Sequence, residues 1–469
     1  MRPPFATLLQ TFAVSVATVL GTGILGLPVA LHASGLRPFL ALFVFNLISQ
    51  IGVIAATTEI LHLAFRASAP HHYQPLDPHA QSHAPSLHSL ASRFISVAFF
   101  RTVFSFLVLL HFLFILSTYA LAGPQAYVAL FPILATVPIQ LIQTVFVLVS
   151  ALLIISADTR LLPSVTLATI AKALLLTVLV SLTLARSLTI REPVHDDWRL
   201  PVLIDPLLMG TMALSGVVNL MPVTFHKSID SLPPTDATVD RQFVAAYRNA
   251  TVIGIIVCFL LNIAWAIAVL FSVPQSSSSS AVAHATRALV RAVKPCATLQ
   301  EAYDQGQIAT IPLVKVLQCR KDSLDSVISF IVNLFIVVSI TVSFLVMSMG
   351  MKHYLDGQAR EKAESPQDYD YARGFRYLVC FGIVLGTALA NPHGLFRIME
   401  GVTTLALNIE AGLFMLFMLY VARSDDGGEH SLLSPLAASF VYLFVGFYFL
   451  TVVCVDSFFY LPRTILRQS

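Results

Sequence analysis

Long apolar runs alternate with short polar segments along almost the whole chain. A helix that crosses a bilayer needs about 20 predominantly apolar residues. By that measure the pattern predicts eleven membrane spans, and the chain is expected to be an all-α polytopic membrane protein. The approximate ranges are Phe5–Leu31, Phe39–Leu63, Phe94–Leu121, Val137–Ile155, Leu161–Arg186, Pro206–Phe225, Ala246–Val273, Ser326–Met351, Gly374–Asn391, Phe396–Val421 and Leu432–Val455. The break between the third and fourth spans is placed at Gly123-Pro124, Pro132 and Pro138.

The first apolar run is interrupted near its middle by Gly21-Thr22-Gly23-Ile24-Leu25-Gly26-Leu27-Pro28. Glycine loosens a helix and proline removes a backbone donor, so backbone groups are freed at mid-membrane depth. Unpaired backbone in hydrocarbon costs several kcal/mol per group unless it lines a buried or wet cavity. A broken first helix therefore predicts a substrate site within the membrane.

The sixth run carries a second interruption, Leu214-Ser215-Gly216-Val217-Val218-Asn219-Leu220-Met221-Pro222. Four spans separate the two interruptions, so each opens a five-helix unit. Paired interruptions at corresponding positions favour an inverted repeat with the site at its interface, over two ordinary kinked helices. The expected organisation is a first repeat over residues 1–186, a second over 187–422, and a peripheral eleventh helix and tail over 423–469.

The composition excludes a soluble protein of this size. Of the 469 residues, 57% are hydrophobic and 11% are charged, with a formal net charge of +3. The basic residues are scattered over loops, whereas nucleic-acid binding needs a clustered basic face, so no nucleic-acid partner is expected. The lipid bilayer is the expected environment. Lys and Arg favour the loops on the side of the N-terminus, which predicts that the N-terminus lies inside and the C-terminus outside.

One loop, expected on the inner side at residues 66–93, is rich in histidine. Such a loop can bind a metal, and an ordinary linker with frequent histidine is the competing interpretation. No span pairs His with Asp at the one-turn spacing that a zinc pathway would use, so no metal site is expected in the membrane. The histidines concerned are His71, His72, His79, His83 and His88.

The longest polar segment, residues 274–325, is expected on the outer side. It contains Cys296 and Cys319. In an oxidising compartment these two cysteines can form a disulfide, although sequence spacing alone does not establish the geometry.

Several motifs resemble a known family. The first interruption, followed by Ala30 and Ala33-Ser34-Gly35, resembles the first-helix signature of the amino acid/auxin permease family, within the amino acid–polyamine–organocation superfamily. Parts of the eighth span and the segment before the tenth are similar to the aromatic and hydroxy amino acid permease branch. These parts are Ser343-Phe344-Leu345, Ser348, Gly350, Tyr354-Leu355-Asp356-Gly357 and Asn391-Pro392-His393-Gly394-Leu395-Phe396.

The resemblance implies a five-plus-five inverted-repeat fold and secondary transport of amino acids by alternating access. The amide groups after the first break would hold the substrate carboxylate, because a half-helix N-terminus favours negative charge. Carbonyl groups freed in the sixth span would face the substrate amino group, and Asn219 would cap the broken turn or touch the substrate. The expected substrate-binding residues are Thr22, Gly23, Ile24, Leu214, Ser215, Gly216 and Asn219.

The coupling ion is expected to be a proton, with sodium as the alternative. Many sodium-coupled relatives carry Asn where this chain has Ala17, whose side chain offers no oxygen ligand. A charge midway along a span is costly, and some proton-coupled superfamily members have a lysine where sodium would sit. Lys172 would therefore replace the cation and titrate during transport, and a static lysine is the alternative. Glu410 is the second candidate. The expected coupling residues are Lys172, Ser339, Ser343 and Glu410.

Glu59 and Arg101 lie near helix ends, where snorkelling to the membrane surface is expected to explain them. No catalytic pair stands out at helical spacing inside the spans, so neither an enzyme nor a cofactor is expected. The expected function is secondary active transport of a neutral or aromatic amino acid, in the plasma membrane or a vacuolar or lysosomal membrane. The alternatives are a sensor or scaffold of the same fold with little flux, and a divalent-metal transporter that rests on the His-rich loop alone.

Overall fold

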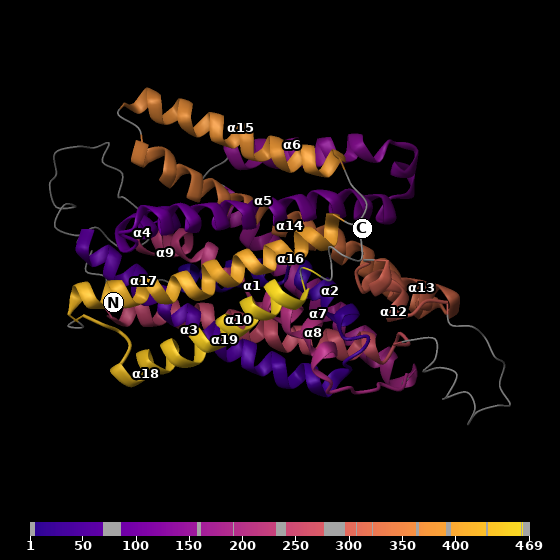
Figure 1. The fold of residues 1–469 in the computed structure, drawn as a ribbon. Coiled ribbons are helices and arrows are strands. Elements are labelled where there is room, and N and C mark those ends of the chain that lie inside the picture. Colours follow the sequence, from indigo (N-terminus) through magenta and orange to yellow (C-terminus); the bar gives the residue numbers. More distant parts are fainter. Residues whose placement is uncertain are drawn as a thin grey trace.

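The computed structural model in Figure 1 is an all-helical bundle. It describes residues 5–68, 86–156, 161–190, 192–230, 241–275, 296–305, 307–320, 322–362, 365–390, 395–427, 430–460 and 462. In this part of the chain there is no strand. Ten of its helices are long and apolar enough to cross a membrane, and α1 (Phe5–Val19) with α2 (Thr22–Ala30) forms an eleventh span bent by 44°. The predicted polytopic all-α protein is confirmed.

The remaining elements follow the predicted order of spans. In the first half they are α3 (Leu36–Ser68), α4 (Leu87–Phe94), α5 (Ala98–Leu130), η2 (Pro132–Thr136), α6 (Ile139–Ser156) and α7 (Leu161–Ile190). In the second half they are α8 (Leu200–Leu214), η3 (Val217–Asn219), α9 (Met221–Asp230), α10 (Arg241–Leu270), α12 (Leu299–Asp304), α13 (Thr310–Arg320), α14 (Ser323–Lys362), α15 (Pro366–Ala390), α16 (Leu395–Leu407), η5 (Asn408–Phe414) and α17 (Met415–Asp426). The last span consists of α18 (Pro435–Phe440), η6 (Val441–Val445), α19 (Gly446–Val455) and η7 (Asp456–Tyr460).

The two halves repeat one order of elements in opposite orientation. Each half opens with an interrupted span, α1–α2 in the first and α8–α9 in the second. Short helices lie between the second and third spans of each half: α4 at the left end of the bundle in Figure 1, and α12 with α13 at the right end. This is the expected five-plus-five inverted repeat. The precise boundaries at residues 186 and 422 stay a prediction.

The interrupted spans lie at the centre of the bundle and are enclosed by long, continuous helices. α1 packs against α7 and α10, and α2 packs against α8. α14 packs along both α5 and α7, and thereby closes the side of the bundle next to α1. α15 and α6 pack against each other at the top of Figure 1, away from this centre.

The break between the third and fourth spans begins later than expected, at Pro132 rather than at Gly123-Pro124. α5 continues through Gly123-Pro124 and ends at Leu130, so the third span is longer than expected and the chain turns at Phe131-Pro132. Proline is tolerated inside a membrane helix because neighbouring groups satisfy the carbonyl that it leaves unpaired. Here Gly123 is in close contact with Phe146 and Ile340, which hold this part of α5 against α6 and α14.

The segment between α10 and α14 is fastened to α2. Cys296 and Cys319 form a disulfide, with Cα atoms 6.7 Å apart. The sequence alone did not decide whether these two cysteines are paired. The backbone amide of Ala309 donates to the carbonyl of Leu25 over 2.8 Å. α12 and α13 therefore lie at the end of the first span that α2 forms.

Glu59 departs from its expected role. Its side chain is fully buried, and its carboxylate accepts from Arg423 Nη1 (2.7 Å), Ser431 Oγ (2.7 Å) and the Leu433 amide (2.9 Å). Snorkelling is wrong for this residue, because its charge is neutralised inside the protein.

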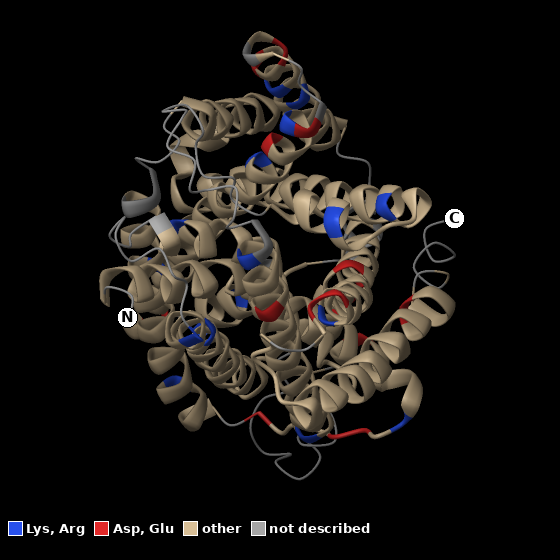
Figure 2. Ribbon diagram, turned by 90° about the vertical axis from the view of Figure 1, so that its left-hand side faces the viewer, with Lys and Arg blue, Asp and Glu red and all other residues tan. Residues whose placement is uncertain are grey.

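Elsewhere Lys and Arg are spread over several helices rather than gathered into one patch, as the sequence indicates (Figure 2).

Candidate functional site

The first span is interrupted at Leu20 and Gly21. α1 ends at Val19, and the Gly21 amide donates to the Val19 carbonyl over 2.8 Å in a tight turn. α2 begins at Thr22 without a side-chain cap. The first amide groups of a helix have no partner within it, so the residues from Thr22 to Ile24 present N–H donors at the positive end of the α2 dipole.

The second interruption lies in the sixth span. α8 ends at Leu214, Ser215 is extended, and Gly216 adopts the left-handed conformation with φ of 93°. A residue with a Cβ is strained in that conformation, which explains the glycine. The last carbonyl groups of α8 have no partner within the helix and provide acceptors at its negative end. The short turn η3 then leads into α9.

The two interruptions adjoin each other. A Cβ placed on Gly23 would lie 2.5 Å from the Ala213 Cα, so α2 and α8 approach backbone to backbone. A Cβ on Gly216 would lie 3.6 Å from Thr18 Cγ2 on α1. The Tyr119 hydroxyl of α5 lies directly against Gly21. Helix-end donors and acceptors thus meet in one place, enclosed by α5.

Buried polar atoms at the second break have unused hydrogen-bonding capacity. Ser215 Oγ and both side-chain polar atoms of Asn219 have no hydrogen-bond partner within the described residues. Both residues are buried, and a buried polar group without a partner costs free energy, about 1–3 kcal/mol each. A polar ligand between the breaks would satisfy such groups.

Lys172 of α7 lies beside the first break and is completely buried. Its ammonium group donates to the Ala17 carbonyl (3.2 Å), the Ser339 carbonyl (3.5 Å) and Ser343 Oγ (2.8 Å). An ammonium has three donors, and all three find oxygen acceptors here. No carboxylate within the described residues forms an ion pair with it. The lysine therefore occupies a set of oxygens of the kind that would coordinate a small cation.

Two serines of α14 extend this contact to the end of α1. Ser339 Oγ donates to the Leu20 carbonyl over 3.2 Å, and Ser343 Oγ lies 3.4 Å from the Ala17 carbonyl. Lys172 and the two serines consequently join α7 and α14 to the last turn of α1. This turn leads directly into the first break.

Glu410 forms a separate group. It lies in η5, a π-helical turn of the tenth span, and π-helical turns are frequent at functional sites. The carboxyl group is fully buried beside the Asn219 side chain, and neither oxygen has a hydrogen bond of normal geometry within the described residues. Glu410 therefore contacts the second break, whereas Lys172 contacts the first.

The structure brings together most of the residues that the sequence singles out. Gly216 lies against Thr18 of α1, Asn219 lies beside Glu410 of η5, and Lys172 contacts both expected serines; the side chain of Thr22 lies outside the described part. Tyr119 is a further residue at the site, and no motif in the sequence marks it. Of the five histidines in the His-rich loop, the structure describes only His88, which lies in α4 and contacts Glu361. Within the described residues, no three His, Cys, Asp or Glu side chains are placed to hold a metal.

Comparison with known proteins gives a match of structure only. No protein-family model and no curated protein matches this sequence, so membership of the amino acid/auxin permease family stays a prediction. The chain is similar to the crystal structure of MhsT in complex with L-phenylalanine, with a TM-score of 0.60 and 12% sequence identity. The match covers 97% of this chain and 100% of that one. Over nearly its whole length, the chain therefore has the same fold as MhsT.

Proposed function

We propose that this protein is a secondary transporter that moves a neutral or aromatic amino acid across a membrane by alternating access, coupled to protons. The observation that carries the proposal is the contact between the two interrupted helices. Their ends supply N–H donors and carbonyl acceptors in one buried place. A zwitterion needs both kinds of partner at once.

The amino acid would bind across the breaks. Its carboxylate would accept from the amides of Thr22, Gly23 and Ile24, where the α2 dipole favours negative charge. Its ammonium would donate to carbonyl groups around Leu214, Ser215 and Gly216, and Asn219 would contact the substrate. The phenylalanine named in the MhsT complex supports an amino acid as the class of substrate.

Proton coupling rests on Lys172. The ammonium stands among oxygens that could otherwise hold a sodium ion, and it joins α7 and α14 to the end of α1. Loss of its proton would remove one donor and the positive charge, and would loosen that connection. The orientation of the first span would then depend on the proton. Glu410 beside Asn219 is a second candidate for proton transfer.

The disulfide bears on the orientation in the membrane. Structural disulfides persist in oxidising compartments, so the end of the bundle with α12 and α13 would face the exterior or an organelle lumen. The N-terminal end would then face the cytoplasm. The plasma membrane and a vacuolar or lysosomal membrane both fit that arrangement.

Uptake into proteoliposomes tests the proposal. The purified full-length protein would be reconstituted and given each labelled amino acid under an imposed pH gradient, with and without sodium. We expect accumulation of one group of neutral or aromatic amino acids above the outside concentration, abolished by a protonophore and independent of sodium.

Two outcomes would contradict the proposal. Saturable binding without accumulation would indicate a sensor of the same fold. Uptake of a divalent metal that is lost on deletion of residues 71–88, with no amino acid uptake, would indicate a metal carrier.

A further inference from the structure

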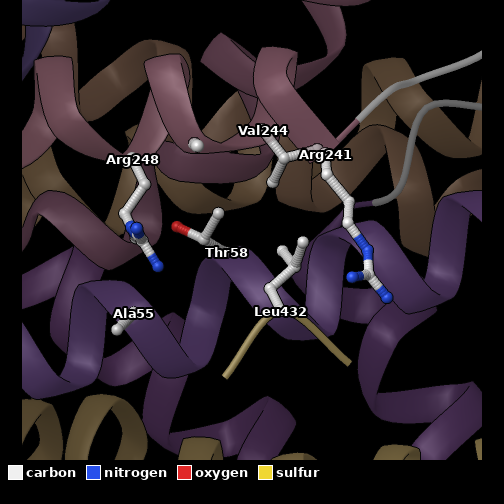
Figure 3. A pocket seen from close by; sticks show the side chains of 7 residues that line it. Ala55, Thr58, Arg241, Val244, Arg248 and Leu432 are labelled. Carbon is white, nitrogen blue, oxygen red and sulfur yellow. The ribbon is translucent and has the colours of Figure 1, made fainter. Parts of the chain in front are cut away.

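A pocket opens between α3 and α10 at the end of the bundle where α10 begins (Figure 3). Its volume is about 160 Å³. That is smaller than the roughly 300–1,000 Å³ of typical small-molecule pockets, and it suits one compact group rather than a large ligand. None of the described residues that line the pocket lies in α1, α2, α8 or η3, the elements around the helix breaks.

Two arginines line the pocket. Arg241 and Arg248 are seven residues apart on α10, so they lie on one face of the helix, about 10 Å apart along its axis. Figure 3 shows both guanidinium groups directed from α10 towards α3. No hydrogen bond or ion pair joins Arg248 to any part of the chain that the structure describes. This guanidinium, two turns inside the helix, therefore has donors available to a ligand.

Among the described residues that line the pocket, none carries a carboxylate. The nearby Glu59 is already neutralised by Arg423. Asp426 is also near this end of α3, where it accepts from the His430 amide over 2.8 Å. The charged residues among the described lining are the two arginines, and their positive charge suits an anion.

The rest of the lining is apolar except for one hydroxyl. Ala55, Val244 and Leu432 cover the walls between the arginines. Thr58 Oγ donates to the Ile54 carbonyl over 2.7 Å, and this residue is buried. Basic groups beside an apolar wall match a ligand with a phosphate and an apolar part.

We propose that this pocket binds the phosphate of an anionic lipid headgroup. Arg241 at the start of the helix and Arg248 two turns deeper would hold one phosphate each or share one, since guanidinium groups bind phosphate with paired hydrogen bonds. Under the expected orientation this end of the bundle faces the cytoplasmic leaflet, which carries the anionic lipids. The same phosphate chemistry could reach the pocket as a soluble phosphate ester.

Lipid binding to the full-length protein in phosphatidylcholine nanodiscs tests the proposal. The probe is dioctanoyl phosphatidylinositol 4-phosphate, with soluble inositol 1,4-bisphosphate as competitor. Each basic residue near a membrane surface contributes about 1 kcal/mol to such binding, so Arg248→Gln and Arg241→Gln are each expected to weaken it about fivefold. The double substitution is expected to weaken it more than tenfold, and Arg248→Lys less than Arg248→Gln.

The control is Arg373→Gln, which removes the same charge from α15, away from the pocket. Should Arg248→Gln fail to fold, Arg241→Gln at the exposed start of α10 provides the test. Competition by the soluble bisphosphate at equal affinity would assign the site to a soluble phosphate ester, and weak competition would assign it to the lipid. Binding that is unchanged in the double variant, or equal for the wild type and all the variants, would overturn the proposal.

Discussion

Lys172 is a buried cation whose partners are two carbonyl groups and a hydroxyl rather than a carboxylate. Burying a charge in this way is costly, and it persists in membrane spans mainly where it has a function. The three acceptors come from α1, which ends at the first break, and from α14, which packs against α1. A change of charge at one side chain would therefore alter the contact between three helices.

Lys172→Gln is expected to uncouple transport from protons. The amide keeps two donors for the oxygens but does not titrate, so accumulation driven by a pH gradient should be lost while exchange of amino acids across the membrane continues. The measurement is uptake and exchange in the same proteoliposomes. Lys352→Gln is the matched control, since Lys352 is also buried and donates to a carbonyl, that of Ile154, away from the breaks. Equal pH-driven accumulation by wild type and Lys172→Gln would exclude the proton role.

Gly23 tests the contact between the two breaks. A methyl group at this position would lie 2.5 Å from the Ala213 Cα, so Gly23→Ala must push α2 away from α8. Overpacking of this kind costs about 1–3 kcal/mol, and we expect substrate affinity to fall about tenfold or more. Gly382→Ala serves as control because nothing lies within 4 Å of that position. Unchanged binding in Gly23→Ala would mean that the contact is irrelevant to the site.

At the scale of elements, Glu59 fastens the middle of α3 to the end of α17 and to the chain that follows. The carboxylate receives three hydrogen bonds from Arg423, Ser431 and Leu433. This end of the bundle therefore depends on a buried ion pair. When one partner is removed, the other is left as an unpaired buried charge, which costs free energy.

Glu59→Gln leaves the largely buried Arg423, whose side chain is 16% exposed, without its counter-charge. Such a loss typically costs about 3–5 kcal/mol, so a clear fall in the thermal midpoint is expected in detergent. Asp370→Asn breaks the exposed pair with Arg373, and exposed pairs are worth about 0–1 kcal/mol, so this control should remain near wild type. If the two variants had the same midpoint, the Glu59 pair would not stabilise the fold.

α4 joins α14 through His88 and Glu361. Burial lowers the pKa of His88 below its ordinary value of 6.5, although the Glu361 carboxylate opposes the shift. The folded protein thus binds this proton less readily than the unfolded chain. Above pH 6.5 His88 is neutral in both states, and the free energy of unfolding has its full value. As the pH falls from 6.5 through the lowered pKa, the unfolded chain takes up this proton first, and the free energy of unfolding decreases.

The thermal midpoint of the wild type is therefore expected to fall between pH 7 and pH 5 by more than that of His88→Gln. Measurement of both proteins in one buffer series provides the comparison. An identical fall in both would show that another group causes the pH dependence.

For the whole molecule, the apolar pattern was sufficient to predict the number and order of spans, because membrane spans need long apolar runs whatever their neighbours. The interruptions at Gly21 and Gly216 could be found for a similar reason, since glycine and proline mark freed backbone. The continuation of α5 through Pro124 could not, because side chains of other helices decide whether a proline ends a helix. Glu59 was misjudged because its partner, Arg423, is distant in sequence.

The site itself was only partly visible in the sequence. Lys172 stood out as a charge in an apolar run, and its serine partners followed from the resemblance to the permease family. Tyr119 offered no such contrast, and the pocket of Arg241 and Arg248 forms only when α3 and α10 pack together. A site that depends on one unusual residue is therefore easier to predict from sequence than a site that ordinary residues of separate helices form together.

The most direct test of the central claim is an experimental structure of the protein with the amino acid that competes best in uptake. The account predicts ligand density between the two breaks, with the carboxylate at the amides of Thr22, Gly23 and Ile24 and the ammonium at the carbonyl groups of Leu214, Ser215 and Gly216. Density at another place, or either helix continuous through its glycine, would contradict it.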